Sequence, residues 1–335
     1  MQAVIYGPEG LELTRDETQF FRDADPAGFI LFRRNCETPD QLQRLTDSLR
    51  DLTGRADLPI LIDQEGGRVA RMRPPVWPAF PAAERFAQLY QAAPSSAIEA
   101  VRSNARALAL MLRSCGINVD ALPLLDVRQE GATDIIGDRA LGNDPMQVAA
   151  LGRAVLDGLG SAGVVGIVKH MPGHGRALVD SHKELPVVTA SADELESDLE
   201  PFERLASAPM GMTAHVVYTA WDAERPASLS PVVIGEIIRG RIGFDGFLMS
   251  DDIGMEALAG DFGSRAAGVV AAGCDAALHC SGKMEEMVAV AGAAPPLSPE
   301  GEARLARAMA ATMLDDDGPD MAEALAKRDQ LLALV

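Results

Sequence analysis

Short apolar runs alternate with amphipathic segments along the whole sequence, and this alternation restricts the fold more than any other feature. The runs are apolar at consecutive positions, so we expect both faces of each strand to be buried, as in a parallel sheet covered by helices. The eight candidate strands span residues 3–6, 28–32, 59–63, 117–127, 164–170, 211–216, 247–251 and 276–280.

Eight strands that alternate with helical segments over 335 residues predict an α/β fold, the TIM (β/α)8 barrel. The alternative is an open, doubly wound sheet. That fold commonly carries a G-x-G-x-x-G turn after its first strand, and the sequence has none there. The sequence also contains no linker-like, repeated or low-complexity stretch. We therefore expect a single catalytic domain over residues 1–335, with a helical segment from about residue 298 to 335 packed on the barrel.

Two amphipathic segments, residues 39–52 and 96–115, are clear helix candidates between these strands. The second opens with a capping-box pattern from Ser96 to Glu99 and stops at Gly116.

Charge and cysteine content exclude several classes of protein. A formal net charge of −19 repels phosphate backbones and anionic lipid, so we expect neither nucleic acid nor a membrane as a partner. The N-terminal residues lack the pattern of a signal peptide and no apolar run reaches about 18 residues, which predicts a cytoplasmic protein. The four cysteines contain no C-x-x-C pair and are predicted to be buried free thiols.

Polar side chains follow the predicted strands at the points where the strands end. In a TIM barrel these ends converge on one mouth, where the chemistry takes place. Each residue taken singly also has an ordinary structural explanation: Ser250 and Asp252 suit helix N-caps, and a lone His215 suits a buried, hydrogen-bonded position. Their repeated occurrence at the same end of the strands favours a functional site. The residues concerned are Asp63, Arg68, Arg71, Asp126, Arg139, Lys169, His170, His215, Ser250, Asp251 and Asp252.

The segment KHMPGHGRALVDSH, residues 169–182, contains three of the five histidines of the chain. Residues 170–190 show no periodicity, and loops of this length in compact domains are usually functional or disordered. In extended geometry Asp180 and His182 point to the same side, so the carboxylate can orient the ring as a proton shuttle. The alternative is that Asp180 caps a local turn and His182 is exposed.

The same segment raises the question of a metal site, because His170 and His174 are four residues apart. Pro172 and Gly173 between them argue against a helix that presents both rings on one face. Lys169 would also place a cation beside the metal. We therefore expect neither a metal nor a cofactor.

Several motifs in order along the chain resemble those of family 3 glycoside hydrolases, most closely the bacterial β-N-acetylglucosaminidases of cell-wall recycling. The motifs are GPEGLELT (7–14), GFILFRRN (28–35), DQEGGRVAR (63–71), IIGDRALGNDP (135–145), KHMPGHG (169–175), DSH (180–182), AHVVYTAWDAERPASLS (214–230) and MSDDIGMEAL (249–258).

The resemblance implies a retaining enzyme whose partner is a small carbohydrate, a peptidoglycan fragment that ends in N-acetylglucosamine. It implies that Asp251 is the nucleophile and that His182, with Asp180, is the general acid/base. The positions that match those holding the terminal sugar are Asp63, Arg71, Arg139, Lys169 and His170.

Three alternatives remain open on the sequence. A histidine in place of an anionic acid/base does not repel phosphate, which allows a phosphorylase on the same scaffold. The histidines also allow a metal-dependent hydrolase. A non-catalytic sugar sensor would retain the pocket without the chemistry.

Overall fold

The structure is a computed structural model that describes residues 1–181, 183–310, 312 and 318–335. Within these residues, eight parallel strands close into a barrel in the order β1-β10-β9-β7-β5-β4-β3-β2. The predicted TIM barrel is therefore confirmed. The barrel strands are β1 (Gln2–Tyr6), β2 (Pro26–Leu31), β3 (Ile60–Ile62), β4 (Val119–Asp120), β5 (Val165–Met171), β7 (Met210–Thr213), β9 (Phe247–Asp252) and β10 (Ala276–His279).

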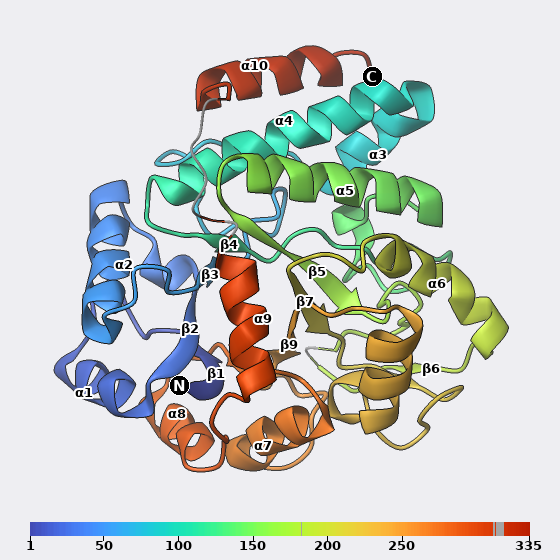
Figure 1. Cartoon of the computed structure of the whole chain (residues 1–335). Coiled ribbons are helices and arrows are strands. Elements are labelled where there is room, and N and C mark those ends of the chain that lie inside the picture. Colours follow the sequence, from blue (N-terminus) through green and yellow to red (C-terminus); the bar gives the residue numbers. More distant parts are fainter. Residues whose placement is uncertain (182, 311, 313–317) are drawn as a thin grey trace.

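Helices surround the barrel and connect successive strands (Figure 1). The α-helices are α1 (Arg15–Ala24), α2 (Pro39–Thr53), α3 (Ala83–Ala92), α4 (Pro94–Arg113), α5 (Pro145–Ser161), α6 (Ala192–Arg204), α7 (Phe262–Ala272), α8 (Met284–Ala291), α9 (Pro299–Ala310) and α10 (Met321–Leu332). Shorter helical segments are η1 (Arg33–Asn35), η2 (Gly137–Arg139), η3 (Ala227–Leu229) and the π-helical η4 (Val233–Arg241).

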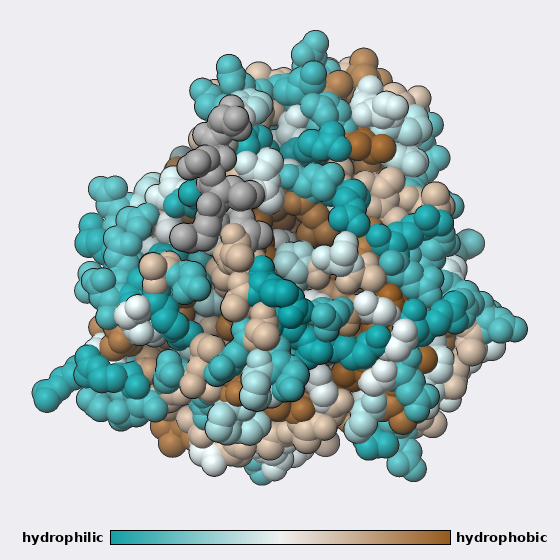
Figure 2. Space-filling view, in the orientation of Figure 1, coloured by the Kyte–Doolittle hydropathy of each residue, from teal (hydrophilic) through white to brown (hydrophobic). Residues whose placement is uncertain are grey.

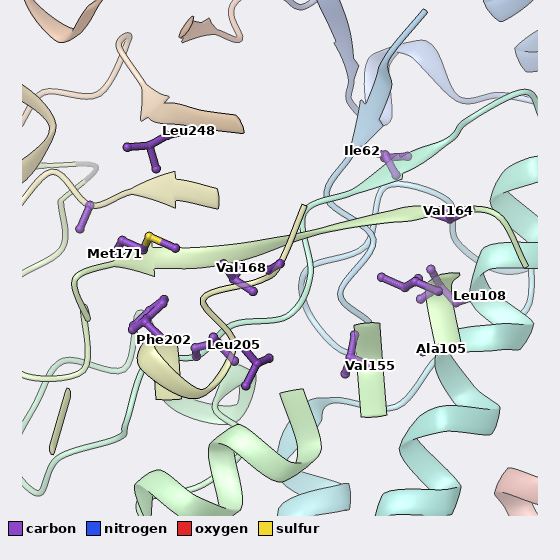
Figure 3. Close-up of a cluster of buried hydrophobic side chains, with 14 of the residues drawn as sticks. Ile62, Ala105, Leu108, Val155, Val164, Val168, Met171, Phe202, Leu205 and Leu248 are labelled. Atoms are coloured by element: carbon purple, nitrogen blue, oxygen red, sulfur yellow. The ribbon is translucent and has the colours of Figure 1, made fainter. Parts of the chain in front are cut away.

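Alternation along each strand divides the apolar side chains into two sets. On β5, Val165 and Ile167 join a cluster inside the barrel, whereas Val168 joins the cluster between the barrel and its helices. Figure 3 shows this outer cluster, in which side chains of β5 lie near Leu108 of α4, Val155 of α5 and others from α6. Because both faces are covered, the strands are apolar at almost every position.

Helix α9 packs against the amino-terminal end of the barrel. Leu305, Ala308 and Met309 of this helix belong to the interior cluster of the barrel, and Figure 1 shows α9 over the centre of the strands. Hydrophilic residues cover much of the surface on this side (Figure 2). Helix α10 lies instead beside α4. With this end of the barrel covered, the opposite end is the one open to ligand.

Two details of the sequence-based predictions are wrong. The strand expected over 117–127 is regular only at Val119–Asp120; it is interrupted at Pro123, which has no N–H for the ladder, and a single bridge between Leu124 and Lys169 follows. Helix α4 begins at Pro94, so Ser96 lies inside its first turn and forms no capping box with Glu99. A proline at the first helical position starts a helix without a side-chain cap, since its missing N–H needs no partner.

A small two-stranded sheet, β6 (Val187–Val188) paired with β8 (Val217–Tyr218), was not predicted. It ties the end of the long loop after β5 to the segment after β7. The predicted helix over 39–52 is confirmed as α2, and the four cysteines are free, with Cys115, Cys274 and Cys280 buried. In the part of the chain described, no helix is both long enough and apolar enough to cross a bilayer.

Candidate active site

Charged side chains at the open end of the barrel continue the inward face of the strands. Asp63, Lys169 and Asp251 each lie two positions after a residue of the interior cluster, and residues two apart on a strand share a face. The preceding interior residues are Leu61, Ile167 and Met249. The strand pattern therefore turns these three polar groups toward a common point at the carboxyl ends of the strands.

A cavity of about 250 Å³ lies at this point. It brings together six of the eight predicted site residues, namely Asp63, Arg71, Arg139, Lys169, His170 and Asp251. Other residues that line it are Phe32, Glu65, Arg68, Val69, Ile135, Ile136, His174, Ser181, Met212, Asp252, Met255, Leu278 and Cys280. Asp180 is described but is not among the lining residues, and His182 lies outside the described residues.

One side of the cavity is a network of buried ion pairs. Lys169 Nζ lies 3.1 Å from Asp63 Oδ1 and 2.7 Å from Glu65 Oε1. Arg71 donates to Asp63 Oδ2 at 3.0 Å, and Arg139 donates to both oxygens of Glu65 at 2.8 Å. Burial raises the pKa of Asp63, but Lys169 and Arg71 outweigh it and hold that pKa well below its usual range. The network thus contains three cations and two ionised carboxylates. The cations can donate hydrogen bonds to the hydroxyl groups of a ligand, and the carboxylates can accept them.

Glu65 is a site residue that the sequence reasoning missed. It has 9% of its surface exposed and bridges Lys169 and Arg139, which belong to different segments of the chain. A signal was available, because the residues predicted to hold the sugar included three cations, Arg71, Arg139 and Lys169, and a single carboxylate, Asp63. Buried charges need partners, so a second acid in the same motif was required.

Glu65→Gln is expected to lower the free energy of unfolding by about 3 kcal/mol, because Arg139 loses its carboxylate partner and Lys169 loses one of its two. We also expect KM to rise, since Arg139 is no longer held by two hydrogen bonds. Urea unfolding and steady-state kinetics measure both effects. The matched control is Glu99→Gln, which removes a half-exposed partner of Arg102 and should cost at most about 1 kcal/mol. Equal losses in the two variants would contradict the bridging role.

A second polar group holds the loop after β5 to the barrel. Asp126 is fully buried; its Oδ2 lies 2.8 Å from Nδ1 of His170, and its Oδ1 accepts from the backbone amides of His170 and His174. Burial raises the pKa of Asp126, but the two histidines outweigh it and the pKa falls to about 2. Asp126 therefore orients His170 toward the cavity and fixes the start of the loop.

Asp251 and Asp252 are adjacent carboxylates in different environments. Burial raises the pKa of Asp251, but His170 and His215 outweigh it, so the pKa lies below its usual range. Burial raises the pKa of Asp252 to about 6, and its Oδ1 accepts from the amides of Gly254 and Cys280. Asp251 is thus ionised near neutral pH, as a nucleophile must be.

The strand-end residues Ser250, Asp252 and His215 have different roles in the structure. Neither Ser250 nor Asp252 caps a helix, because β9 runs through both and α7 begins later, with Asp261 as its N-cap. His215 is fully buried and hydrogen-bonded to Ser228 Oγ at 2.7 Å and to the carbonyl of Asp252 at 3.0 Å. It therefore supports the strand that carries Asp251 and matches the structural explanation.

The loop between β5 and β6, residues 172–186, reaches back to the cavity. Ser181 lines the cavity, and its Oγ lies 3.2 Å from Nε2 of His174. The carbonyl of Asp180 accepts hydrogen bonds from the amides of Lys183 and Glu184. The carbonyl of Asp180 is thus hydrogen-bonded to residues three and four positions later, and the predicted pairing of Asp180 with His182 lies outside the described residues.

A further carboxyl group lies buried close to the ion-pair network. Asp120 has no exposed surface; its Oδ1 accepts from the amide of Gln64, and its Oδ2 has no partner among the described residues. Burial raises its pKa to about 8. The folded protein thus keeps a proton on Asp120 that an unfolded chain releases near pH 4.

Asp120→Asn is expected to stabilise the fold, and by more at pH 8 than at pH 5. Because the pKa of Asp120 is higher in the folded protein than in the unfolded chain, Asp120 contributes its full stability below the unfolded pKa. This contribution is lost as the pH rises toward the folded pKa of about 8. Asparagine mimics the protonated acid at every pH and escapes this loss. Urea unfolding at the two pH values tests this, with the exposed Asp51→Asn as control. A gain that does not grow with pH would show that Asp120 is ionised in the folded protein.

Comparison with known proteins agrees with this geometry. The family described as "Glycosyl hydrolase family 3 N terminal domain" matches residues 5–310. A beta-hexosaminidase of Bordetella avium is 39% identical over 83% of this chain and 80% of its own length. Another beta-hexosaminidase, from Chromobacterium violaceum, is 38% identical over 96% of this chain and 92% of its own.

Among solved structures, NagZ from Neisseria gonorrhoeae in complex with N-trifluoroacetyl-D-glucosamine is similar to this chain with a TM-score of 0.86. The two are 33% identical, and the similarity covers 99% of this chain and 98% of the other. The family match, the barrel and the charged cavity at its open end agree: the chain belongs to glycosyl hydrolase family 3 and is a glycoside hydrolase.

Proposed function

We propose that this protein is an exo-acting, retaining β-N-acetylglucosaminidase. The observation that carries the proposal is the cavity in which the ionised carboxylate of Asp251 faces a buried network of charged hydrogen-bonding groups. Its volume of about 250 Å³ suits one sugar residue better than a chain, which agrees with removal of a terminal sugar. The beta-hexosaminidase relatives and the N-acylated glucosamine in the NagZ complex support the sugar's identity.

The network around Lys169 would bind the ring hydroxyls of the terminal sugar. Its carboxylates accept from hydroxyl groups, and its cations donate through charge-assisted hydrogen bonds. Because each charge has a partner within the network itself, the groups are held in place before the sugar arrives. This preorganisation reduces the ordering cost of binding.

The reaction would proceed through a covalent sugar ester. In the first step an oxygen of Asp251 bonds to the anomeric carbon as the bond to the leaving oxygen breaks, and His182 gives that oxygen its proton. In the second step water attacks the anomeric carbon and gives a proton to His182, and the ester bond to Asp251 breaks. Asp180 would stabilise the imidazolium form of His182, as the aspartate of a catalytic triad does.

We further propose that the leaving group is 1,6-anhydro-N-acetylmuramic acid, with or without its peptide, and that the reaction takes place in the cytoplasm. The support is the likeness to NagZ and the motifs shared with enzymes of cell-wall recycling. The enzyme is expected to cleave the disaccharide of N-acetylglucosamine β-linked to this sugar. Failure to cleave it, with cleavage of another β-glycoside, would contradict the recycling role.

Labelling with a 5-fluoro-N-acetylglucosaminyl donor tests the mechanism directly. The fluorine slows both steps, so the sugar ester accumulates and mass spectrometry of the digested protein locates it. We expect one labelled peptide, modified at Asp251. A label on another acid would overturn the assignment, and sugar phosphate among the products when phosphate is added would identify a phosphorylase instead.

A further inference from the structure

The loop after β5 has a firmly held first part. The hydroxyl of Tyr218 donates to the carbonyl of Gly173 at 2.7 Å, and Arg176 Nε donates to the buried carboxylate of Asp198 at 2.7 Å. The carbonyl of Ala177 accepts from the amide of Thr133 at 3.0 Å. Bonds to three different segments of the fold therefore fix the chain up to residue 177.

The second part of the loop, from residue 178 to 185, is more exposed than the first. Leu178 is 69% exposed, and Lys183 and Glu184 are also exposed. Among the described residues from 178 to 185, Ser181 is the one that is buried, with 3% of its surface exposed. A small polar residue thus returns to the cavity from an otherwise exposed stretch.

His174 is the partner that Ser181 meets there, and it is itself fixed. Its amide donates to Asp126 at 2.7 Å, its ring packs edge-on against His170, and only 3% of its surface is exposed. Both His174 and Ser181 line the cavity that contains Asp251. Burial, together with His170, lowers the pKa of His174 to about 4, so its ring is neutral near pH 7.

We propose that the His174–Ser181 hydrogen bond positions the outer part of the loop, which carries Asp180, for the acid/base step at the bound sugar. The inference rests on the proposed function, because it assigns positioning residues to the acid/base step of that reaction. His174 provides a fixed point on the barrel, and Ser181 attaches the outer part of the loop to it. Neither residue exchanges a proton with the substrate.

The Ser181→Ala variant tests this inference with glycosides of graded leaving-group ability. Protonation matters most when the leaving group is poor, so we expect kcat/KM to fall about tenfold for alkyl glycosides, the effect of one lost buried hydrogen bond. Activated aryl glycosides should lose less than about threefold, since their departure needs little protonation. Ser181→Thr keeps the hydroxyl group and is expected to retain most of the activity that Ser181→Ala loses. The matched control is Thr189→Ala, which removes an exposed hydroxyl just beyond the loop.

A double-mutant cycle with His182→Ala separates positioning from general damage. If Ser181 acts through His182, Ser181→Ala should cause no further fall in kcat/KM for alkyl glycosides when it is combined with His182→Ala. A loss of equal size in both backgrounds, or an equal loss across all leaving groups, would overturn the inference. So would unchanged activity of Ser181→Ala on alkyl glycosides.

The cycle also distinguishes this inference from the proposed function. If His182→Ala alone shows no dependence on the leaving group, the acid/base assignment fails whatever Ser181 does. If His182→Ala shows the dependence and Ser181→Ala does not, only the positioning role fails.

Discussion

Asp251→Asn is expected to lower kcat by at least about a thousandfold while the protein stays folded. The carboxylate of Asp251 lies in the cavity, and His170 and His215 favour its ionised form despite its burial. An amide at this position cannot form the sugar ester, whereas it occupies nearly the same volume. Turnover of an aryl N-acetylglucosaminide measures the loss, and circular dichroism checks the fold.

The neighbouring carboxylate provides a matched comparison for this variant. Asp252 lines the same cavity, but its pKa is raised to about 6 and its Oδ1 is occupied by two backbone amides. Asp252→Asn should therefore cost much less activity than Asp251→Asn. The reverse order, or near-normal turnover by Asp251→Asn, would show that another residue is the nucleophile.

His182→Ala is expected to lower kcat/KM by about a hundredfold or more for glycosides with poor leaving groups, because general acid catalysis contributes about 10²–10⁴-fold. Activated aryl glycosides should be affected far less, since their leaving group departs without a proton. The decline of kcat/KM as pH rises through the titration of the acid should also disappear in this variant. A series of aryl and alkyl glycosides, each measured across pH, tests both expectations.

Asp180→Asn is the companion variant for His182→Ala. If Asp180 stabilises the imidazolium of His182, its replacement should give the same dependence on leaving group with a smaller loss. An equal loss on every substrate, from either variant, would indicate a role in binding or folding instead of proton transfer.

The cavity also shows how buried charge is distributed in this acidic protein. The net charge of the chain is −19, yet the network of Asp63, Glu65, Lys169, Arg71 and Arg139 carries one more positive than negative charge. The carboxylate of Asp251 balances that excess. If the proposed sugar ester forms at Asp251, the loss of that charge is expected to strengthen the attraction of the cations for the oxygens of the sugar.

The sequence alone predicted the barrel and the place of the chemistry, because both depend on local periodicity. Consecutive apolar residues indicate strands buried on both faces, and two-residue alternation extends the inward face of each strand to Asp63, Lys169 and Asp251. The local pattern was less reliable where one residue breaks the regular geometry. Pro123 interrupted a strand and Pro94 started a helix early.

The tertiary structure decided which charged groups meet. Glu65 and Arg139 are separated by 74 residues in the chain, and Asp126 joins His170 and His174 across two strand ends. No local pattern encodes such partners, because closure of the barrel brings the strand ends together and sets their distances. The contact between His174 and Ser181 likewise joins two residues whose meeting the spacing of the motif did not predict. Periodicity thus placed the functional groups at one end of the barrel, and the folded chain determined their partners.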